Sequence, residues 1–249
     1  MSNQDAEMLK LNTATSDVNA TSSDMNATSS DMNTTAADMN TVTSDMNSAS
    51  SNMNAATGDD ARTTTGRKYH CRKLGFDDLE RVMHWRMSQH VTKYMNTDPV
   101  LTIEAQKKWF QELTDTEANY YWVIEVDDTP CGVINLEGID VKNKRCTWGY
   151  YVAEKSLRSF RLSMCLEMSL YDYVFDIVGM NKISGESFCE NAAAIKMHEM
   201  CGCETEGVLK MHIFKNGQFY DVCVQSMYAQ LWRKIRSGFQ YQKIKFEDT

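Results

Sequence analysis

The chain has 249 residues, of which 26 are Lys or Arg and 34 are Asp or Glu, so its net charge near pH 7 is −8. Residues 1–65 hold two basic and nine acidic side chains, and the rest of the chain holds 24 and 25. The foldable part is nearly neutral, which argues against nucleic acid as a partner, because binding phosphates needs a basic surface. No apolar signal core or 18-residue apolar run is present, so we expect a soluble, cytoplasmic protein with no membrane partner.

Residues 1–66 carry a seven-residue repeat that begins at Asn12, with copies such as NATSSDM and NTVTSDM. A coiled coil needs two apolar positions in each repeat, and here only the last position is regularly large and apolar. Asn, Ser, Thr and Asp fill most other positions, and their side chains compete with the helical backbone for hydrogen bonds. We therefore predict a disordered tail over residues 1–66, with weak self-association through the methionines as the alternative.

The chain after this tail begins with a predicted strand at residues 68–74. A helix follows from Asp77 or Asp78 to about residue 91, and Thr102 is suited to cap a second helix that ends near residue 113. Residues 120–126 and 131–139 predict a hairpin across the turn DDTP, and residues 145–154 predict a further strand.

A long helix is predicted from Ser159 to about Val178, then a strand at 181–190 and a helix from Asn191 that ends before Gly202. Asn216-Gly217 between apolar runs predicts a hairpin over residues 203–228, and residues 229–235 predict a short helix. The order indicates a mixed α/β domain of the α+β class over residues 67–236. We expect the charged segment 237–249 to be a loose tail.

The eight cysteines form no CxxC pair, and several lie within apolar runs. Buried, reduced thiols are the simplest interpretation, and this too is typical of a cytosolic protein. Cys201 and Cys203 flank Gly202, but no second pair has the spacing of a metal site. We interpret this stretch as a turn before a strand and expect no metal.

The stretch WGYYVAEKSLRSFRLS resembles part of the GCN5-related N-acetyltransferase (GNAT) superfamily. At this place the family has Arg/Gln-x-x-Gly-x-Gly/Ala between a strand and a helix. Arg158 matches the first position, whereas Arg161 and Ser163 stand where the glycines belong. Glycine is dispensable here if the loop keeps ordinary dihedral angles, since a helix N-terminus supplies N–H groups to an anion whatever its side chains.

The stretch ENAAAIKMHEMCGC resembles the family pattern Asn-x-x-Ala-x-x-x-Tyr-x-x-x-Gly-Phe. Asn191 stands at the asparagine, His198 at the tyrosine and Cys203 at the phenylalanine. The resemblance covers residues 68 to about 232 and implies a central, mostly antiparallel sheet flanked by helices.

The resemblance implies acetyl-CoA as co-substrate, with its pyrophosphate at the helix N-terminus and its pantetheine along the preceding strand. The alternative is a solvated, basic helix start in a protein that has lost its cofactor. The residues implied in cofactor binding are Tyr150, Val152, Arg158, Ser159, Phe160, Arg161, Leu162, Ser163 and Asn191.

The tyrosine of the second motif protonates the departing CoA thiolate in the family, which implies this role for His198. A histidine titrates near pH 6.5 in model peptides and suits the task. The alternative is a histidine on the exposed side of its helix. Glu186 is a weaker candidate for a general base. Asn191 can also serve simply as a helix N-cap.

The stretch HWRMSQHVTKYMNTDPVLTIEAQKKWF resembles one branch of the superfamily, the nucleotide-sugar N-acetyltransferases of pseudaminic acid biosynthesis. That branch acetylates the 4-amine of UDP-4-amino-4,6-dideoxy-N-acetyl-β-L-altrosamine, and its product feeds flagellin glycosylation. The resemblance implies Arg86 and Tyr94 as contacts for the diphosphate and for a base or sugar face. The alternatives are an N-terminal protein acetyltransferase and a non-catalytic binding module. The sequence leaves open whether the protein is a homo-oligomer.

Overall fold

The computed structural model describes residues 66–114 and 118–247, so the predicted repeat tail lies outside the described residues. Within these ranges seven strands form one sheet in the order β1-β2-β3-β4-β5-β7-β6, and every neighbouring pair is antiparallel except β4 and β5. The predicted mostly antiparallel sheet is confirmed. The strands are β1 (Tyr69–Lys73), β2 (Tyr120–Val126), β3 (Thr129–Asp140), β4 (Arg145–Val152), β5 (Lys182–Phe188), β6 (Glu204–Lys215) and β7 (Gln218–Tyr228).

The parallel pairing of β4 with β5 is short and ends inside the sheet. Only Arg145–Thr147 of β4 pair with β5, opposite residues 182–184. Beyond this point β4 continues to Val152 beside β3, and β5 continues to Phe188 beside β7. The Trp148 side chain lies where the strands part, and a Cβ atom on Gly185 would come within 3.0 Å of its Nε1. Within the described ranges, one edge of β4 beyond Thr147 is therefore left without a strand partner.

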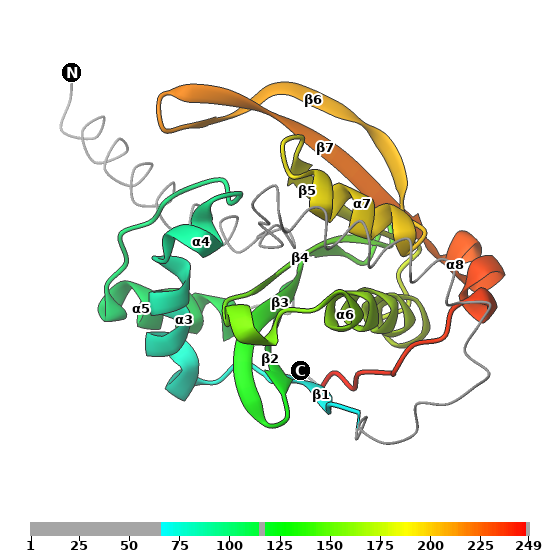
Figure 1. The fold of residues 1–249 in the computed structure, drawn as a ribbon, viewed down its shortest axis with the longest axis horizontal. Coiled ribbons are helices and arrows are strands. Elements are labelled where there is room, and N and C mark those ends of the chain that lie inside the picture. Colours follow the sequence, from blue (N-terminus) through cyan, green and yellow to red (C-terminus); the bar gives the residue numbers. More distant parts are fainter. Residues whose placement is uncertain (1–65, 115–117, 248–249) are drawn as a thin grey trace.

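Helices cover both faces of this sheet (Figure 1). On one face lie α3 (Leu79–Arg86), α4 (Gln89–Thr92) and α5 (Ile103–Thr114), packed against the odd-numbered side chains of β2 and β4. On the other lie α6 (Phe160–Asp172), its π-helical continuation η3 (Tyr173–Ile177), α7 (Ala192–Met200) and α8 (Ala229–Ile235). Short 3₁₀ turns are η1 (Phe76–Asp78), η2 (Lys155–Leu157) and η4 (Arg236–Gly238). No helix in the described ranges is long and apolar enough to cross a bilayer.

The predicted helix over residues 77–91 is in fact broken into α3 and α4. Ser88 adopts an extended backbone (φ −80°, ψ 131°), and its hydroxyl donates to the carbonyl of Trp85. A short polar side chain that bonds to the preceding turn competes with helix continuation. The break lets α4 cross the end of β4, where His90 Nε2 lies 3.0 Å from the carbonyl oxygen of Ala153.

The chain end differs from the predicted loose tail. Up to Glu247 it lies against the sheet, and Phe246 forms a parallel bridge with Cys71 of β1. Ile244 and Phe246 are buried, and the Phe246 ring meets that of Trp122 edge-on, with centroids 5.0 Å apart. Apolar side chains between the charges, also including Phe239 and Tyr241, bury enough surface to order this segment.

Replacing Phe246 with Ala should lower the free energy of unfolding by about 3–5 kcal/mol, because it leaves a cavity beside Trp122. Urea denaturation followed by tryptophan fluorescence measures the change. Phe214→Ala is the matched control: this ring is 62% exposed, so its loss should cost well under 1 kcal/mol. Equal stability of Phe246→Ala and the wild type would show that the C-terminal segment contributes no packing.

Candidate active site

The turn between β4 and α6 is the first part of the site, and this turn contains no glycine. Glu154, Arg158 and Ser159 have φ values of −80°, −67° and −156°, and no residue from 153 to 163 has a positive φ. The loop thus keeps ordinary dihedral angles, which removes the conformational need for glycine. The side chain of Arg158 turns back, and its Nε donates to the carbonyl oxygen of Val152 over 2.7 Å.

The N-terminus of α6 is capped but keeps open donors. Ser159 Oγ accepts from the N–H of Leu162, and the Ser159 carbonyl accepts from the N–H of Ser163. The N–H groups of Phe160 and Arg161 precede the first intrahelical bond, so they are available to an anion. Arg161 is exposed beside them, whereas Leu162 and Ser163 are buried and present only their backbone.

These features fit an elongated ligand that carries amides and a pyrophosphate. The edge of β4 beyond Thr147 lacks a strand partner among the described residues, so its backbone can bond to amides. The α6 N-terminus and Arg161 suit phosphates. Tyr150 contributes only its backbone, since its side chain is 2% exposed and its hydroxyl donates to Glu167 on α6. The predicted cofactor residues from Tyr150 to Ser163 thus form one continuous strand–turn–helix unit.

His198 lies on α7, and the interpretation of an exposed histidine is wrong, because the residue is 3% exposed. Its Nδ1 is 2.9 Å from Oε1 of Glu167, and its ring meets that of Trp148 edge-on at 4.7 Å. Trp148 marks the point where β4 and β5 part, so His198 packs beneath the open edge of β4. Asn191 begins the same helix, and its side chain caps the N–H of Ala194, as its simpler interpretation predicted.

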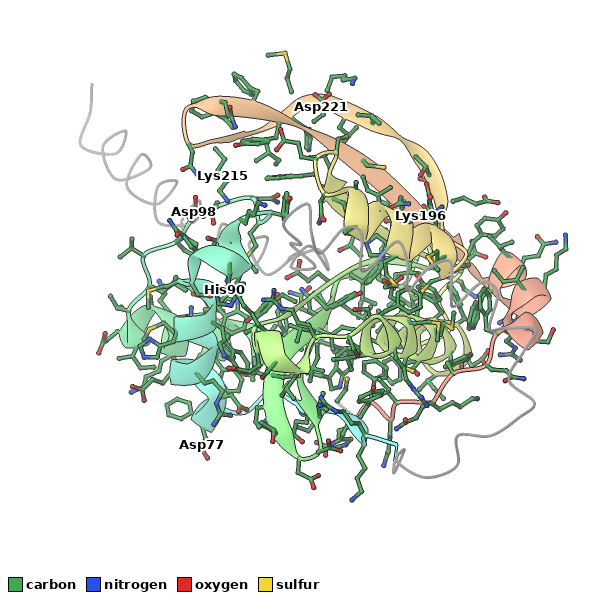
Figure 2. The ribbon with its side chains drawn as sticks, in the orientation of Figure 1. Asp77, His90, Asp98, Lys196, Lys215 and Asp221 are labelled. Atoms are coloured by element: carbon green, nitrogen blue, oxygen red, sulfur yellow. The ribbon has the colours of Figure 1, made fainter. Side chains whose placement is uncertain are left out.

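A cavity of about 970 Å³ lies on the opposite face of the sheet, between the α4 region and the tip of the β6–β7 hairpin; we call it the hairpin groove (Figure 2). Its size lies at the upper end of the range for small-molecule pockets, about 300–1,000 Å³. Its lining residues are Met87, Gln89, His90, Thr92, Lys93, Tyr94, Asp98, Pro99, Val100, Glu190, Lys215, Asn216 and Tyr220.

Lys215 joins the two sides of the hairpin groove. It is 6% exposed, and its Nζ donates to the carbonyl oxygens of Thr92 and Met95 at 2.6 and 2.9 Å and pairs with Asp98 at 3.1 Å. Asn216 also donates to Asp98, at 2.8 Å. Partial burial alone would raise the pKa of Asp98, but hydrogen bonds from Thr92, Asn216 and Lys215 outweigh it and lower that pKa. This carboxylate therefore stays ionised, and the hairpin tip is fastened to the α4 region.

The groove contains one of the two predicted substrate residues. Tyr94 is part of the lining, and Lys93 Nζ lies 4.7 Å above its ring centre. Arg86 is 1% exposed and bonds to the sulfur of Met95, which favours a structural role. Glu186 is exposed on the face of β5 that also carries Phe188, and Phe188 stacks on Tyr220 of the groove.

Some residues of the site could not be recognised in the sequence. Asn216 predicts only a hairpin turn, and Lys215 beside it carries no signal of the buried contacts that it makes. Glu167 is a carboxylate within an apolar helical run, a placement that could have indicated its burial but not its partner. Asp98, Glu190 and Tyr220 carry no local signal, because the groove forms only from segments distant in sequence.

Comparison with known proteins identifies the family to which this chain belongs. The sequence profile of the acetyltransferase (GNAT) domain matches residues 70–204, which is more than half of the chain. The chain belongs to the GNAT acetyltransferase family. It is therefore an N-acetyltransferase with acetyl-CoA as co-substrate, as the two motifs predicted.

Relatives and solved structures agree with this membership. The chain is 26% identical over 161 residues to the uncharacterized N-acetyltransferase YoaA of Bacillus subtilis, covering 63% of this chain and 90% of the relative. It is 22% identical to spermidine N(1)-acetyltransferase of Vibrio cholerae, covering 61% and 87%. The structure of a Vibrio cholerae spermidine N-acetyltransferase with CoA and spermine superposes with a TM-score of 0.63 at 20% identity, covering 68% and 99%. That likeness confirms the predicted fold.

Charge reversal at Arg161 tests the phosphate end of the site. Arg161→Glu should raise the KM for acetyl-CoA about tenfold or more, since a hydrogen bond to a charged group contributes about 1.5–3 kcal/mol. Steady-state kinetics at saturating acceptor measures it, and Arg233→Glu, an exposed residue of α8, is the control. An unchanged KM would remove Arg161 from the acetyl-CoA site.

A second substitution tests the hairpin groove. If the hairpin groove holds the acceptor, Lys215→Met should raise the KM for the acceptor about tenfold and leave that for acetyl-CoA unchanged, because it unfastens the hairpin tip from the α4 region. Lys210→Met is the matched control, since Lys210 pairs with Asp221 on the exposed part of the same hairpin. If both variants change the acceptor KM equally, the clamp has no special role.

Proposed function

We propose that this N-acetyltransferase acetylates the primary amine of a nucleotide-linked amino sugar held in the hairpin groove. The observation that supports this most is the groove itself, whose volume of about 970 Å³ suits a ligand longer than a simple amine. Tyr94 and Tyr220 offer aromatic faces for a base or a sugar ring. Lys93 supplies an ammonium group for a diphosphate, and the polar side chains of Gln89 and Asn216 can bond to hydroxyls.

The transfer needs no covalent enzyme intermediate. The uncharged amine attacks the thioester carbonyl, a C–N bond forms, the C–S bond breaks and the thiolate leaves. Backbone N–H groups on the open edge of β4 are suited to stabilise the developing oxyanion. The amine loses one proton, to water or to Glu186, and the thiolate gains one, which we assign to His198.

A polyamine is the second candidate for the acceptor. Glu190 in the groove lining and Glu186 on the neighbouring face of β5 are exposed carboxylates, which suit a substrate with several ammonium groups. The similarity to spermidine acetyltransferases favours the same class.

An acceptor panel distinguishes these proposals. Purified full-length protein and acetyl-CoA are offered UDP-4-amino-4,6-dideoxy-N-acetyl-β-L-altrosamine, spermidine and N-terminal peptides of ribosomal proteins, and products are detected by mass spectrometry. We expect a single acetyl group on the 4-amine of the nucleotide sugar, with a kcat/KM at least about a hundredfold above the others. Preferential acetylation of spermidine or of a peptide would overturn the nucleotide-sugar proposal, and binding of acetyl-CoA without transfer would indicate a non-catalytic module.

Replacing His198 tests the acid. His198→Ala should lower kcat and kcat/KM together by about 10²–10⁴-fold with little effect on acetyl-CoA affinity, because the proton moves only in the transition state. His198→Tyr restores the family residue and should recover much of the rate. Wild-type activity should fall on the alkaline side as the imidazolium loses its proton. Nearly full kcat in His198→Ala with the same pH profile would show that His198 has no part in the transfer.

A further inference from the structure

The carboxylate of Glu167 is completely buried in the middle of α6, at 0% exposure. Its Oε1 lies 3.0 Å from the hydroxyl of Tyr150 and 2.9 Å from Nδ1 of His198. Its Oε2 accepts the hydroxyl of Tyr171 at 3.0 Å. Three elements thus direct donors at one carboxylate: β4, α6 and α7. Such convergence is what an ionised carboxylate needs in an interior, where an unpaired charge is very unfavourable.

The other titratable groups around Glu167 are kept neutral. Burial raises the pKa of Tyr171 well above its ordinary value, and the nearby carboxylate of Glu167 adds to this effect. Burial, together with Glu167, likewise raises the pKa values of the Cys201 and Cys203 thiols. Tyr150 donates from the remaining side. Among the described residues, these neutral donors leave Glu167 as the acceptor at the centre of the cluster, in contact with His198.

The contact also decides which nitrogen of His198 is protonated in the neutral ring. An ionised carboxylate only accepts hydrogen bonds, so Nδ1, which faces it, must carry a proton. Nε2 is then the nitrogen that gains and loses a proton, and it has no partner among the described residues. In serine hydrolases a buried carboxylate orients a histidine and stabilises its imidazolium form by the same arrangement.

We propose that Glu167 is a positioning residue for the transfer reaction, which holds His198 with Nδ1 protonated and stabilises the imidazolium that donates from Nε2. This inference rests on the proposed acid role of His198. In the step itself the Nε2–H bond breaks, an S–H bond forms on the CoA thiolate, and His198 returns to its neutral form. Solvent later restores the proton.

The tautomer can be measured on the wild-type protein without any ligand or substitution. Long-range ¹H–¹⁵N correlation spectra at high pH distinguish Nδ1-protonated from Nε2-protonated imidazole, and His198→Tyr identifies the signal among the five histidines. We expect the Nδ1-protonated form. A neutral ring protonated on Nε2, with Nδ1 bare, would overturn the proposal whatever the acceptor proves to be.

Glu167→Gln then removes the charge while keeping the shape. In the free protein, the doubly protonated His198 signal should disappear at a pH about one unit lower than in the wild type, since an opposite charge within hydrogen-bond distance favours the charged form. The alkaline limb of kcat should move the same way, with the KM for acetyl-CoA changed less than about twofold. Glu199→Gln is the matched control, because it removes the same charge from an exposed position on the helix of His198, where solvent screens it, and neither readout should move by more than about 0.3 pH units.

The two readouts separate the inference from the proposed function. No displacement of the His198 signal in Glu167→Gln overturns the coupling between the two residues. A displaced signal with an unmoved kcat profile overturns the link to catalysis and the acid role of His198 with it. Should Glu167→Gln fail to fold, the tautomer of the wild-type protein remains the deciding measurement.

Discussion

The parting of β4 from β5 is the constraint on which the rest of the site depends. Parallel pairing lasts for three residues, after which each strand pairs, in the part of the chain that the structure describes, with a neighbour on one side only. A buried strand edge is costly, because unpaired backbone groups lose their hydrogen bonds to water. The large side chain of Trp148 fills the base of the gap, and the edge of β4 above it is suited to backbone bonds with a ligand. The fold thus leaves open an edge that acetyl-CoA can complete.

The two faces of the sheet contribute different chemistry to this gap. The side of α6 and α7 is closed. There the buried side chains of Glu167, Tyr150, Tyr171 and His198 form a hydrogen-bonded cluster inside the core. Such a cluster holds its members in fixed positions. On the other side the hairpin groove is open, and one buried ammonium group, that of Lys215, fastens its two walls. A histidine held in place below the gap and an open groove above it are what our proposed transfer between two substrates requires.

Helix caps and turns could be predicted from the sequence, because each depends on signals from neighbouring residues. Asn191 capping α7, Thr102 capping α5 and the Asn216-Gly217 turn, with φ values of 50° and 81°, were all recognisable from neighbouring residues. Cys201 and Cys203 flank Gly202 (φ 93°) in the predicted turn. The break at Ser88 and the docked C-terminal segment were missed, because competing or distant contacts decide them. The Glu167–His198 contact joins residues 31 positions apart, so no local pattern announces it.

Hydrogen–deuterium exchange with and without acetyl-CoA tests the central claim most directly, namely that the open edge of β4 and the α6 N-terminus receive this substrate. Peptides covering residues 148–152 and 158–163 should exchange markedly more slowly when acetyl-CoA is bound, because backbone N–H groups there become donors to it. Peptides covering β1, whose backbone is already paired with β2, serve as the internal control and should not change. Protection confined to other segments, with both of these peptides unaffected, would contradict the account.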